Sequence, residues 1–346
     1  MNALTAKKAA ADWVLQVATA ESWFRGAYFA GSIIGMADQA ELARSSDVDV
    51  VVVMDCDEPP IKPGKFVYQG VLLEITYLAL KQLSSAEEIL VSYHLAGSFR
   101  ADTIIADPTG YLRQIQTQVS QHFADYLYVR QRCQQVRDRI DSGLSGLNTQ
   151  APFHDLVTSW LFPTGVTAHL FLVAALENPT VRRRYLAARQ VLLDYGHLDV
   201  YEHLLDLLGC QNLAPQRIEK HVVRLEQTFD AAAAIAKTLF PFSSDISRQA
   251  RPITIDGSRD MIRGGYHREA VFWIVATYAR CHKIMAADAP PELAKQLLPS
   301  FLEAVADLGL VSPDDFLRRA QAVRQALPQL WQTSQDILQR KLTAIQ

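Results

Sequence analysis

The spacing of apolar positions changes near residue 112 of this chain. Before that point, short apolar runs typical of strands are separated by stretches with helical spacing. The pattern predicts helices over 4–24 and 81–93, and strands over 27–30, 48–54, 65–68, 71–78 and 101–106. Gly26 is expected to end the first of these helices. Gln69 and Gly70 stand between two of these strands, where a tight hairpin turn is expected. Helices that alternate with strands in this way predict a small mixed sheet.

After residue 112 the strand pattern stops, and apolar residues recur at steps of three and four. The predicted helices cover 112–141, 153–162, 166–176, 180–194, 199–208, 215–239, 266–286, 291–308 and 312 onward. Pro163 is expected to end the second of them, and residues 240–257 form the longest irregular segment. We therefore expect an α+β protein with a small mixed-sheet domain over 1–112 and an all-α domain over 113–346.

Three carboxylates stand in strands of the first domain, where apolar residues are expected. Asp47 and Asp49 open the apolar run 48–54, and side chains two apart in a strand share a face. Glu74 lies inside the strand 71–78, where an unpaired buried carboxylate would cost several kcal/mol. If the two strands are neighbours, the three side chains can converge on a pair of Mg²⁺ ions. Mg²⁺ takes oxygen ligands and keeps positions for substrate phosphates.

Length and composition are those of an ordinary soluble protein. The chain has 346 residues, of which 49% are hydrophobic and 21% charged, enough for a core in each of two domains. The apolar runs are too short to cross a bilayer and no cleavable leader is recognised, so we expect a cytoplasmic protein with no membrane partner. Four cysteines without a Cys-x-x-Cys pair indicate buried reduced thiols.

Charge is distributed unevenly along the chain, although the formal net charge is only −3. The first 112 residues contain 14 Asp and Glu against 8 Lys and Arg, and the remainder contains 23 against 26. An acidic first part suits a divalent metal, and the second part is too weakly basic to predict nucleic-acid binding. The densest basic cluster, Arg182-Arg183-Arg184, is interpreted as a solvated helix face.

The order of these motifs resembles the nucleotidyltransferase superfamily typified by DNA polymerase β. The resemblance covers about residues 27–110 and is carried by Gly31-Ser32, then Ser46-Asp47-Val48-Asp49-Val50, then a strand with an acidic residue. A catalytic domain followed by a helical bundle is similar in layout to the bacterial aminoglycoside and lincosamide nucleotidyltransferases. The resemblance implies that Asp47 and Asp49 bind two Mg²⁺ ions and that Glu74 binds the catalytic one. It also implies nucleotide contacts by Gly31 and Ser32, which would hold the β and γ phosphates, and by Ser46.

The reaction implied by the resemblance is transfer of a nucleoside monophosphate. A hydroxyl of a small molecule would attack the α-phosphorus of a nucleoside triphosphate, with ATP as the expected donor and pyrophosphate as the product. The helical domain would bind the acceptor, and an aminoglycoside- or lincosamide-like antibiotic is the acceptor that the family suggests. The segment between Ser32 and Asp47 is a few residues longer than in the family, so 38–45 is interpreted as an insertion.

Two other functions and one further cluster remain open on the sequence. The first alternative is an inactive or antitoxin-like protein that keeps the fold for protein binding, and the second is a polynucleotide-extending enzyme, which the charge disfavours. The richest polar cluster of the helical domain contains Arg263, Tyr266, His267, Arg268 and Glu269. It lies just before an apolar helix, where a helix start can meet a phosphate or an acceptor, or where the side chains can simply be structural.

Overall fold

The computed structural model describes residues 1–43, 45–180 and 182–344. By its internal contacts the chain divides into two compact units. The first, here called the sheet unit, consists of Met1–Arg132, Leu176–Val181 and Phe240–Asp245. The second, here called the helical unit, consists of Cys133–Ala175, Arg182–Leu239 and Ile246–Gln346. The expected α+β class is confirmed, and the domain boundary expected near residue 112 stays a prediction.

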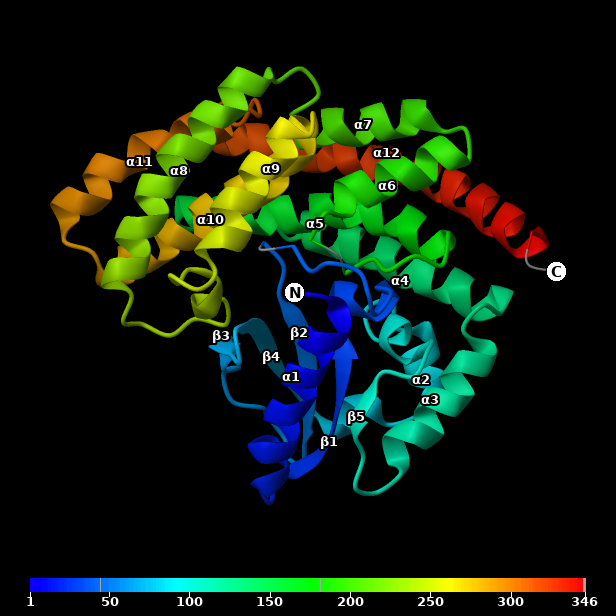
Figure 1. The fold of residues 1–346 in the computed structure, drawn as a ribbon. Helices are drawn as coiled ribbons and strands as arrows, with labels where there is room; N and C mark the ends of the chain where they lie inside the picture. Colours follow the sequence, from blue (N-terminus) through cyan, green and yellow to red (C-terminus); the bar gives the residue numbers. More distant parts are fainter. Residues whose placement is uncertain (44, 181, 345–346) are drawn as a thin grey trace. The chain divides into compact units, whose positions relative to one another are not determined.

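The sheet unit is built on one five-stranded mixed sheet (Figure 1). Its strands are β1 (Phe24–Ala30), β2 (Val48–Met54), β3 (Gly64–Tyr68), β4 (Val71–Ala79) and β5 (Ile104–Ala106). Their order is β3-β4-β2-β1-β5. Strands β2 and β4 pair in parallel, and every other neighbouring pair is antiparallel. The mixed sheet expected from the alternating pattern is therefore confirmed.

Helices cover both faces of this sheet. On one face, α1 (Ala3–Gln16) buries its alanines, Trp13 and Val14 against alternate residues of β2 and β4, among them Val48 and Leu73. The opposite face carries α2 (Ala86–Val91) and α3 (Tyr111–His122), which pack against a cluster that includes Val53. Because both faces are covered, β2 reads as a continuous apolar run in the sequence.

The hairpin between β3 and β4 has the expected turn. Gln69 and Gly70 both have a positive φ, 48° and 77°, as the two central residues of a type I′ turn require. The turn makes Tyr68 the partner of Val71, and it thereby sets the register of the whole hairpin.

The helical unit consists of long helices around an aromatic core. Helix α4 (Tyr126–Ser145) contains the boundary between the two units. The following helices are α5 (Phe153–Ala174), α6 (Arg184–Asp194), α7 (Leu198–Leu208), α8 (Pro215–Ile235), α9 (Gly257–Arg263), α10 (His267–Asp288), α11 (Pro291–Ala306) and α12 (Pro313–Thr343). Fully buried rings, such as Trp160 and Phe316 with centroids 5.9 Å apart, fill the space between them.

Pro163 does not end a helix, contrary to the expectation. Helix α5 runs through it without interruption for 22 residues, and most of its residues are buried. Proline lacks the backbone donor that an unbroken helix would use at this position, and the Thr164 hydroxyl beside it adds a hydrogen bond to the Trp160 carbonyl at 2.8 Å. Among the described residues, α5 is the helix whose length and mean hydropathy would suffice to span a membrane, and 78% of that apolar window is buried. Tertiary burial thus overrides the local signal for a break.

Two further helices differ from their predicted extents. The first helix ends at Gln16, and Gly26, read as its stop, lies at a β-bulge in β1. The long helix expected over 112–141 is two helices, α3 and α4, interrupted after His122. Arg132 stabilises the break, because its guanidinium donates to the Phe123 carbonyl at 2.6 Å and lies over the Phe123 ring.

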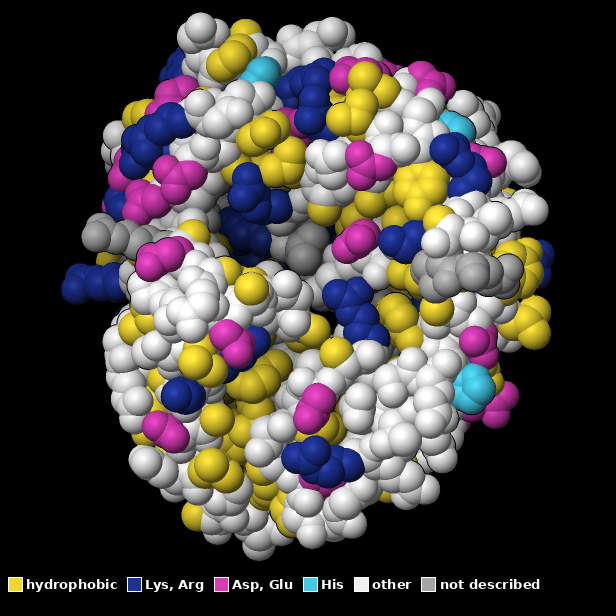
Figure 2. Space-filling view, turned by 45° about the vertical axis from the view of Figure 1, so that its right-hand side comes forward, with side chains coloured by type: hydrophobic (Ala, Val, Ile, Leu, Met, Phe, Trp, Pro, Cys, Tyr) yellow, Lys and Arg dark blue, Asp and Glu magenta, His cyan; other side chains and the backbone are white. Residues whose placement is uncertain are grey.

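The other expected elements are present, with ends that differ by up to four residues from the prediction, except in two places. Residues 81–93 contain only the six-residue α2, preceded by a 3₁₀ turn (Leu80–Leu83). The segment 240–257, expected to be irregular, contains a π-helix (Pro252–Asp256) that leads into α9. On the face drawn in Figure 2, acidic, basic and apolar side chains are intermixed.

Candidate metal site

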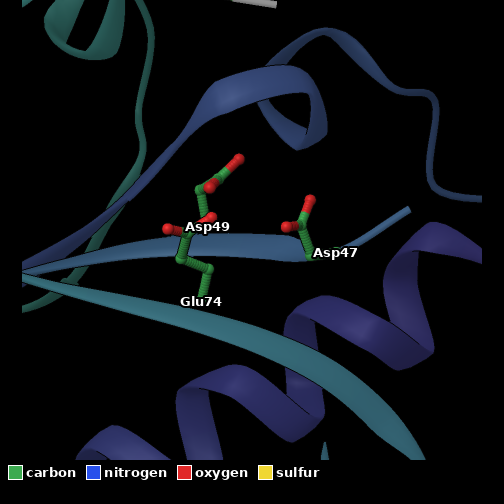
Figure 3. Close-up of side chains that lie close together, drawn as sticks. All are labelled: Asp47, Asp49 and Glu74. Carbon is green, nitrogen blue, oxygen red and sulfur yellow. The ribbon is translucent and has the colours of Figure 1, made fainter. Parts of the chain in front are cut away.

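Strand pairing brings the three predicted carboxylates together. Asp49 on β2 and Glu74 on β4 are register partners in the parallel pair, and Asp47 lies two residues before Asp49. Val48 stands between Asp47 and Asp49, and its register partner Leu73 stands just before Glu74. Both side chains are fully buried on the α1 face. The alternation of a strand therefore directs all three carboxylates to the opposite side. Figure 3 shows them projecting to that side, Asp49 from β2, Asp47 from the position just before this strand and Glu74 from β4.

The geometry of this triad, Asp47, Asp49 and Glu74, fits a divalent cation. One carboxylate oxygen of each residue lies within 4.8 Å of those of the other two. Ligand oxygens on opposite sides of one Mg²⁺ are about 4 Å apart, and around Ca²⁺ about 5 Å. Carboxylate oxygens are the donors that such hard cations prefer. The three carboxylates can therefore bind a metal ion together.

Gly31, predicted to contact phosphates, lies directly against Asp49. It begins a 3₁₀ turn, η2 (Gly31–Gly35), that follows β1 immediately. Its φ is +65°, and a Cβ atom on this residue would lie only 1.9 Å from Asp49 Oδ2. The side-chain amide of Asn178 donates to the Gly31 carbonyl at 2.8 Å and holds the turn in place. The close approach to a triad carboxylate leaves no room for any side chain here.

The other two residues that the resemblance assigned to the nucleotide are less closely held. Ser32 is exposed in η2, and Ser46 is half-buried just before β2 with its N–H donating to the Ala43 carbonyl at 3.0 Å. The segment interpreted as an insertion, 38–45, includes residue 44, which lies outside the described residues. Its earlier part runs along the start of α1, where Asp38 pairs with Lys7 at 3.2 Å.

Two lysines and a fourth carboxylate complete the cluster, and the sequence reasoning missed all three. Lys65 Nζ lies 3.1 Å from Asp47 Oδ2 and 2.9 Å from Asp245 Oδ1, and it also forms an ion pair with Glu74. Lys62 forms a second ion pair with Glu74. Lys65 could have been found by counting back from the hairpin turn, because it is the register partner of Glu74 on β3. No local signal points to Asp245, which lies 180 residues further along the chain.

Burial and neighbouring charges shift the pKa values of the cluster in different directions. Burial, and then the charges of Asp47 and Glu74, raise the pKa of Asp49 to about 8. Burial also acts to raise the pKa of Glu74, but Lys65 and Lys62 outweigh it and the pKa is lowered. Burial opposes the charge of Lys65, yet its three carboxylate neighbours raise the pKa of its ammonium. Lys65 therefore stays positively charged, and the negative charge of Asp49 is the one that a further cation would stabilise most.

The structure gives partners within the protein to several of the remaining candidates from the sequence. In the polar cluster of the helical unit, Arg268 pairs with Glu202 at 2.7 Å and Arg263 with Asp260 at 3.2 Å. Glu269 is buried and accepts a hydrogen bond from the Tyr201 hydroxyl. The expectation of a solvated face for Arg182-Arg183-Arg184 is wrong for Arg184. That side chain is buried, with its guanidinium over the Phe272 and Trp273 rings.

An open groove of about 880 Å³ lies at the other end of β2, away from the triad. Arg25, Asp55 and Tyr111 are among the residues that line it. Arg25 forms an ion pair with Asp55, so that charge is compensated within the groove. The triad, and not this groove, holds the convergent carboxylates.

Comparison with protein-family models gave no match, and no curated protein matched the chain either. The case for a function therefore depends on the geometry of the triad and its neighbours.

Proposed function

We propose that this protein is a divalent-metal-dependent nucleotidyltransferase of the DNA polymerase β type. It would move a nucleoside monophosphate, AMP in the first instance, from a nucleoside triphosphate to a hydroxyl of a small molecule. The observation that carries the proposal is the convergence of three carboxylates from two neighbouring parallel strands within 4.8 Å. The close packing of the Gly31 turn on Asp49 supports it, because this turn follows β1 in the order that the motif requires.

Each residue has a distinct part in the proposed reaction. Asp47, Asp49 and Glu74 would hold the metal, which when bound supplies positive charge to the reacting phosphate and to the departing pyrophosphate. The exposed hydroxyl of Ser32 and the backbone N–H groups of its turn would contact the terminal phosphates. Lys62 and Lys65 add two positive charges beside the acids, where a triphosphate would also need compensation.

A second function is favoured by one observation. Both lysines form ion pairs with Glu74, so part of the acidic charge is compensated by the protein itself. A protein that retains the fold and acts by binding another protein could keep such a cluster for stability. Asp49 argues against this alternative, because in the described part of the chain it forms no ion pair and its carboxylate is destabilised by its neighbours.

A pyrophosphate-release assay tests the proposal. The protein is incubated with Mg²⁺, each labelled nucleoside triphosphate, and panels of aminoglycosides, lincosamides, protein and RNA. We expect release with at least one small-molecule acceptor, its loss in Asp47→Asn, and its retention in Asp12→Asn, which changes an exposed carboxylate of α1. The proposal fails if no acceptor supports release and no Mg²⁺-dependent triphosphate binding is found. Release with RNA or protein alone would support a different acceptor class.

A further inference from the structure

The ammonium of Lys65 lies against two of the carboxylates that a metal ion would use. It contacts two members of the triad, Asp47 and Glu74, and its side chain is only 7% exposed. A divalent ion and an ammonium cannot both keep close contacts with the same two carboxylates, because at these distances their repulsion is of the same order as the attraction to the acids. Metal binding at the triad therefore has to displace Lys65.

A second carboxylate, outside the triad, is placed to receive it. Asp245 ends the 3₁₀ turn η5 (Ser243–Asp245), and its Oδ1 lies 2.9 Å from Lys65 Nζ. The turn packs on the backbone of Gly64, the neighbour of Lys65. A Cβ atom on Gly64 would lie 2.0 Å from Ser244 Oγ, and Gly64 has a φ of +71°. The absence of a side chain at residue 64 thus lets this turn bring Asp245 to Lys65.

We propose that Lys65 is a built-in competitor of the divalent ion at the triad, and that Asp245 holds the displaced ammonium when the ion binds. The inference depends on the proposed function only in requiring a metal site at the triad. Its consequence is a weak affinity for the metal alone. The lysine has to leave Asp47 and Glu74 before the ion can bind, and the carboxylate of Asp245 makes this possible without leaving an ammonium buried and unpaired.

Removal of the lysine charge tests the competition directly. The affinity for Mn²⁺ alone, without nucleotide or acceptor, is measured by calorimetry or by the electron paramagnetic resonance signal of free Mn²⁺. We expect Lys65→Met to bind Mn²⁺ about tenfold more tightly than the unchanged protein. Lys62→Met is the matched control, because Lys62 contacts only Glu74 of the triad and is more exposed, at 24%. Its gain should be about threefold or less.

The part of Asp245 is tested by a double-mutant cycle. Asp245→Asn should weaken Mn²⁺ binding about fivefold in the unchanged protein, because Lys65 then has no second carboxylate. In the Lys65→Met background the same substitution should have no effect. If it weakens binding equally in both backgrounds, Asp245 is a direct metal ligand and its assigned part is wrong.

The outcomes separate this inference from the proposed function. If neither the unchanged protein nor Lys65→Met binds Mn²⁺, the metal site and the proposed function both fail. If both bind it with equal affinity, the metal site stands and the competition by Lys65 is refuted. Circular dichroism checks the fold of each variant. Lys65→Gln, which also removes the charge but keeps a hydrogen-bond donor, replaces Lys65→Met in the cycle if that variant does not fold.

Discussion

The triad of the sheet unit and a charge network of the helical unit hold their carboxylates in different ways. The network, here called the α8–α11 network, joins Arg217, Lys220, His221 and Arg224 of α8 to Glu303 and Asp307. Its two carboxylates meet three Lys or Arg side chains and one histidine. In the sheet unit, four carboxylates, the triad and Asp245, meet two lysines.

The difference is visible in the pKa values of the two regions. Burial acts to raise the pKa of Asp307, but hydrogen bonds from Arg217 and His221 lower it overall. Burial raises the pKa of Asp49 as well, and there the neighbouring carboxylates add to the effect. A carboxylate whose pKa is lowered stabilises the fold in its charged form, whereas one whose pKa is raised destabilises it. Excess negative charge of the second kind is typical of a binding site, because without a bound cation it lowers the stability of the fold.

The strongest test of this comparison is Asp49→Asn. Without the carboxylate we expect the proposed transfer activity to fall by about 10³-fold or more, since the metal would lose a ligand. The free energy of unfolding, measured with urea in the presence of a chelator, should stay equal or rise by about 1 kcal/mol. The reason is that the substitution removes the repulsion between Asp49 and the neighbouring carboxylates. A variant that is less stable in the chelator would mean that Asp49 has a structural role.

The helical unit should respond to pH through His282, a buried neutral side chain. Its ring stacks on Phe301 with centroids 4.9 Å apart, and burial, together with His154, lowers its pKa from 6.5 to about 4. The unfolded chain therefore binds a proton more readily than the folded one between these values. Stability from this group is complete above pH 6.5 and is lost as the pH falls toward 4, by up to about 3 kcal/mol.

His282→Phe keeps the stacked ring and removes the titration. Urea unfolding between pH 4 and pH 7 should show a smaller loss of stability toward acid in this variant than in the unchanged protein. Equal slopes for His282→Phe and the unchanged protein would contradict the assignment.

A smaller effect is expected when the α8–α11 network loses one carboxylate. Asp307 accepts from Arg217 at 2.9 Å and pairs with His221 at 2.6 Å, and its side chain is 19% exposed. Asp307→Asn should lower the free energy of unfolding by about 2 kcal/mol, opposite in sign to Asp49→Asn. Mn²⁺ affinity should stay within about twofold, because the substitution lies outside the sheet unit. An increase in stability would show that this network is not the compensated one.

Much of the sheet unit could be predicted from the sequence, because its signals are local. The apolar run 48–54 and the Gln69-Gly70 turn led to β2 and the β3–β4 hairpin with errors of one residue or less. The alternation of Asp47, Val48 and Asp49 predicted which side chains share a face, and the structure confirms it. The convergence of the triad depends on the pairing of β2 with β4. The sequence leaves this pairing open, and the three-dimensional structure shows it.

Other features depend on contacts that no local pattern carries. The sequence predicts a helix end at Pro163, because the burial of α5 by neighbouring helices leaves no signal in the residues around the proline. Gly26 was read in the same way, although it lies in a strand bulge. Asp245 and Asn178 reach the site from chain segments far beyond the sheet strands. The position of Lys65 could have been predicted from the sequence, because the turn at residues 69 and 70 places it opposite Glu74.

The smallest effect should come from Asp57→Asn, and it sharpens the meaning of the triad. Asp57 belongs to the sheet unit and follows β2, the strand that contains Asp49, but its side chain is 98% exposed and its Oδ1 lies 3.4 Å from Lys81 Nζ. A solvated carboxylate neither converges with others nor loses its hydration, so Mn²⁺ affinity and the midpoint of thermal unfolding should both be unchanged. If Asp57→Asn weakened Mn²⁺ binding as much as Asp49→Asn does, general negative charge of the sheet unit would explain the binding. Burial and convergence of the triad would then not be what selects the ion.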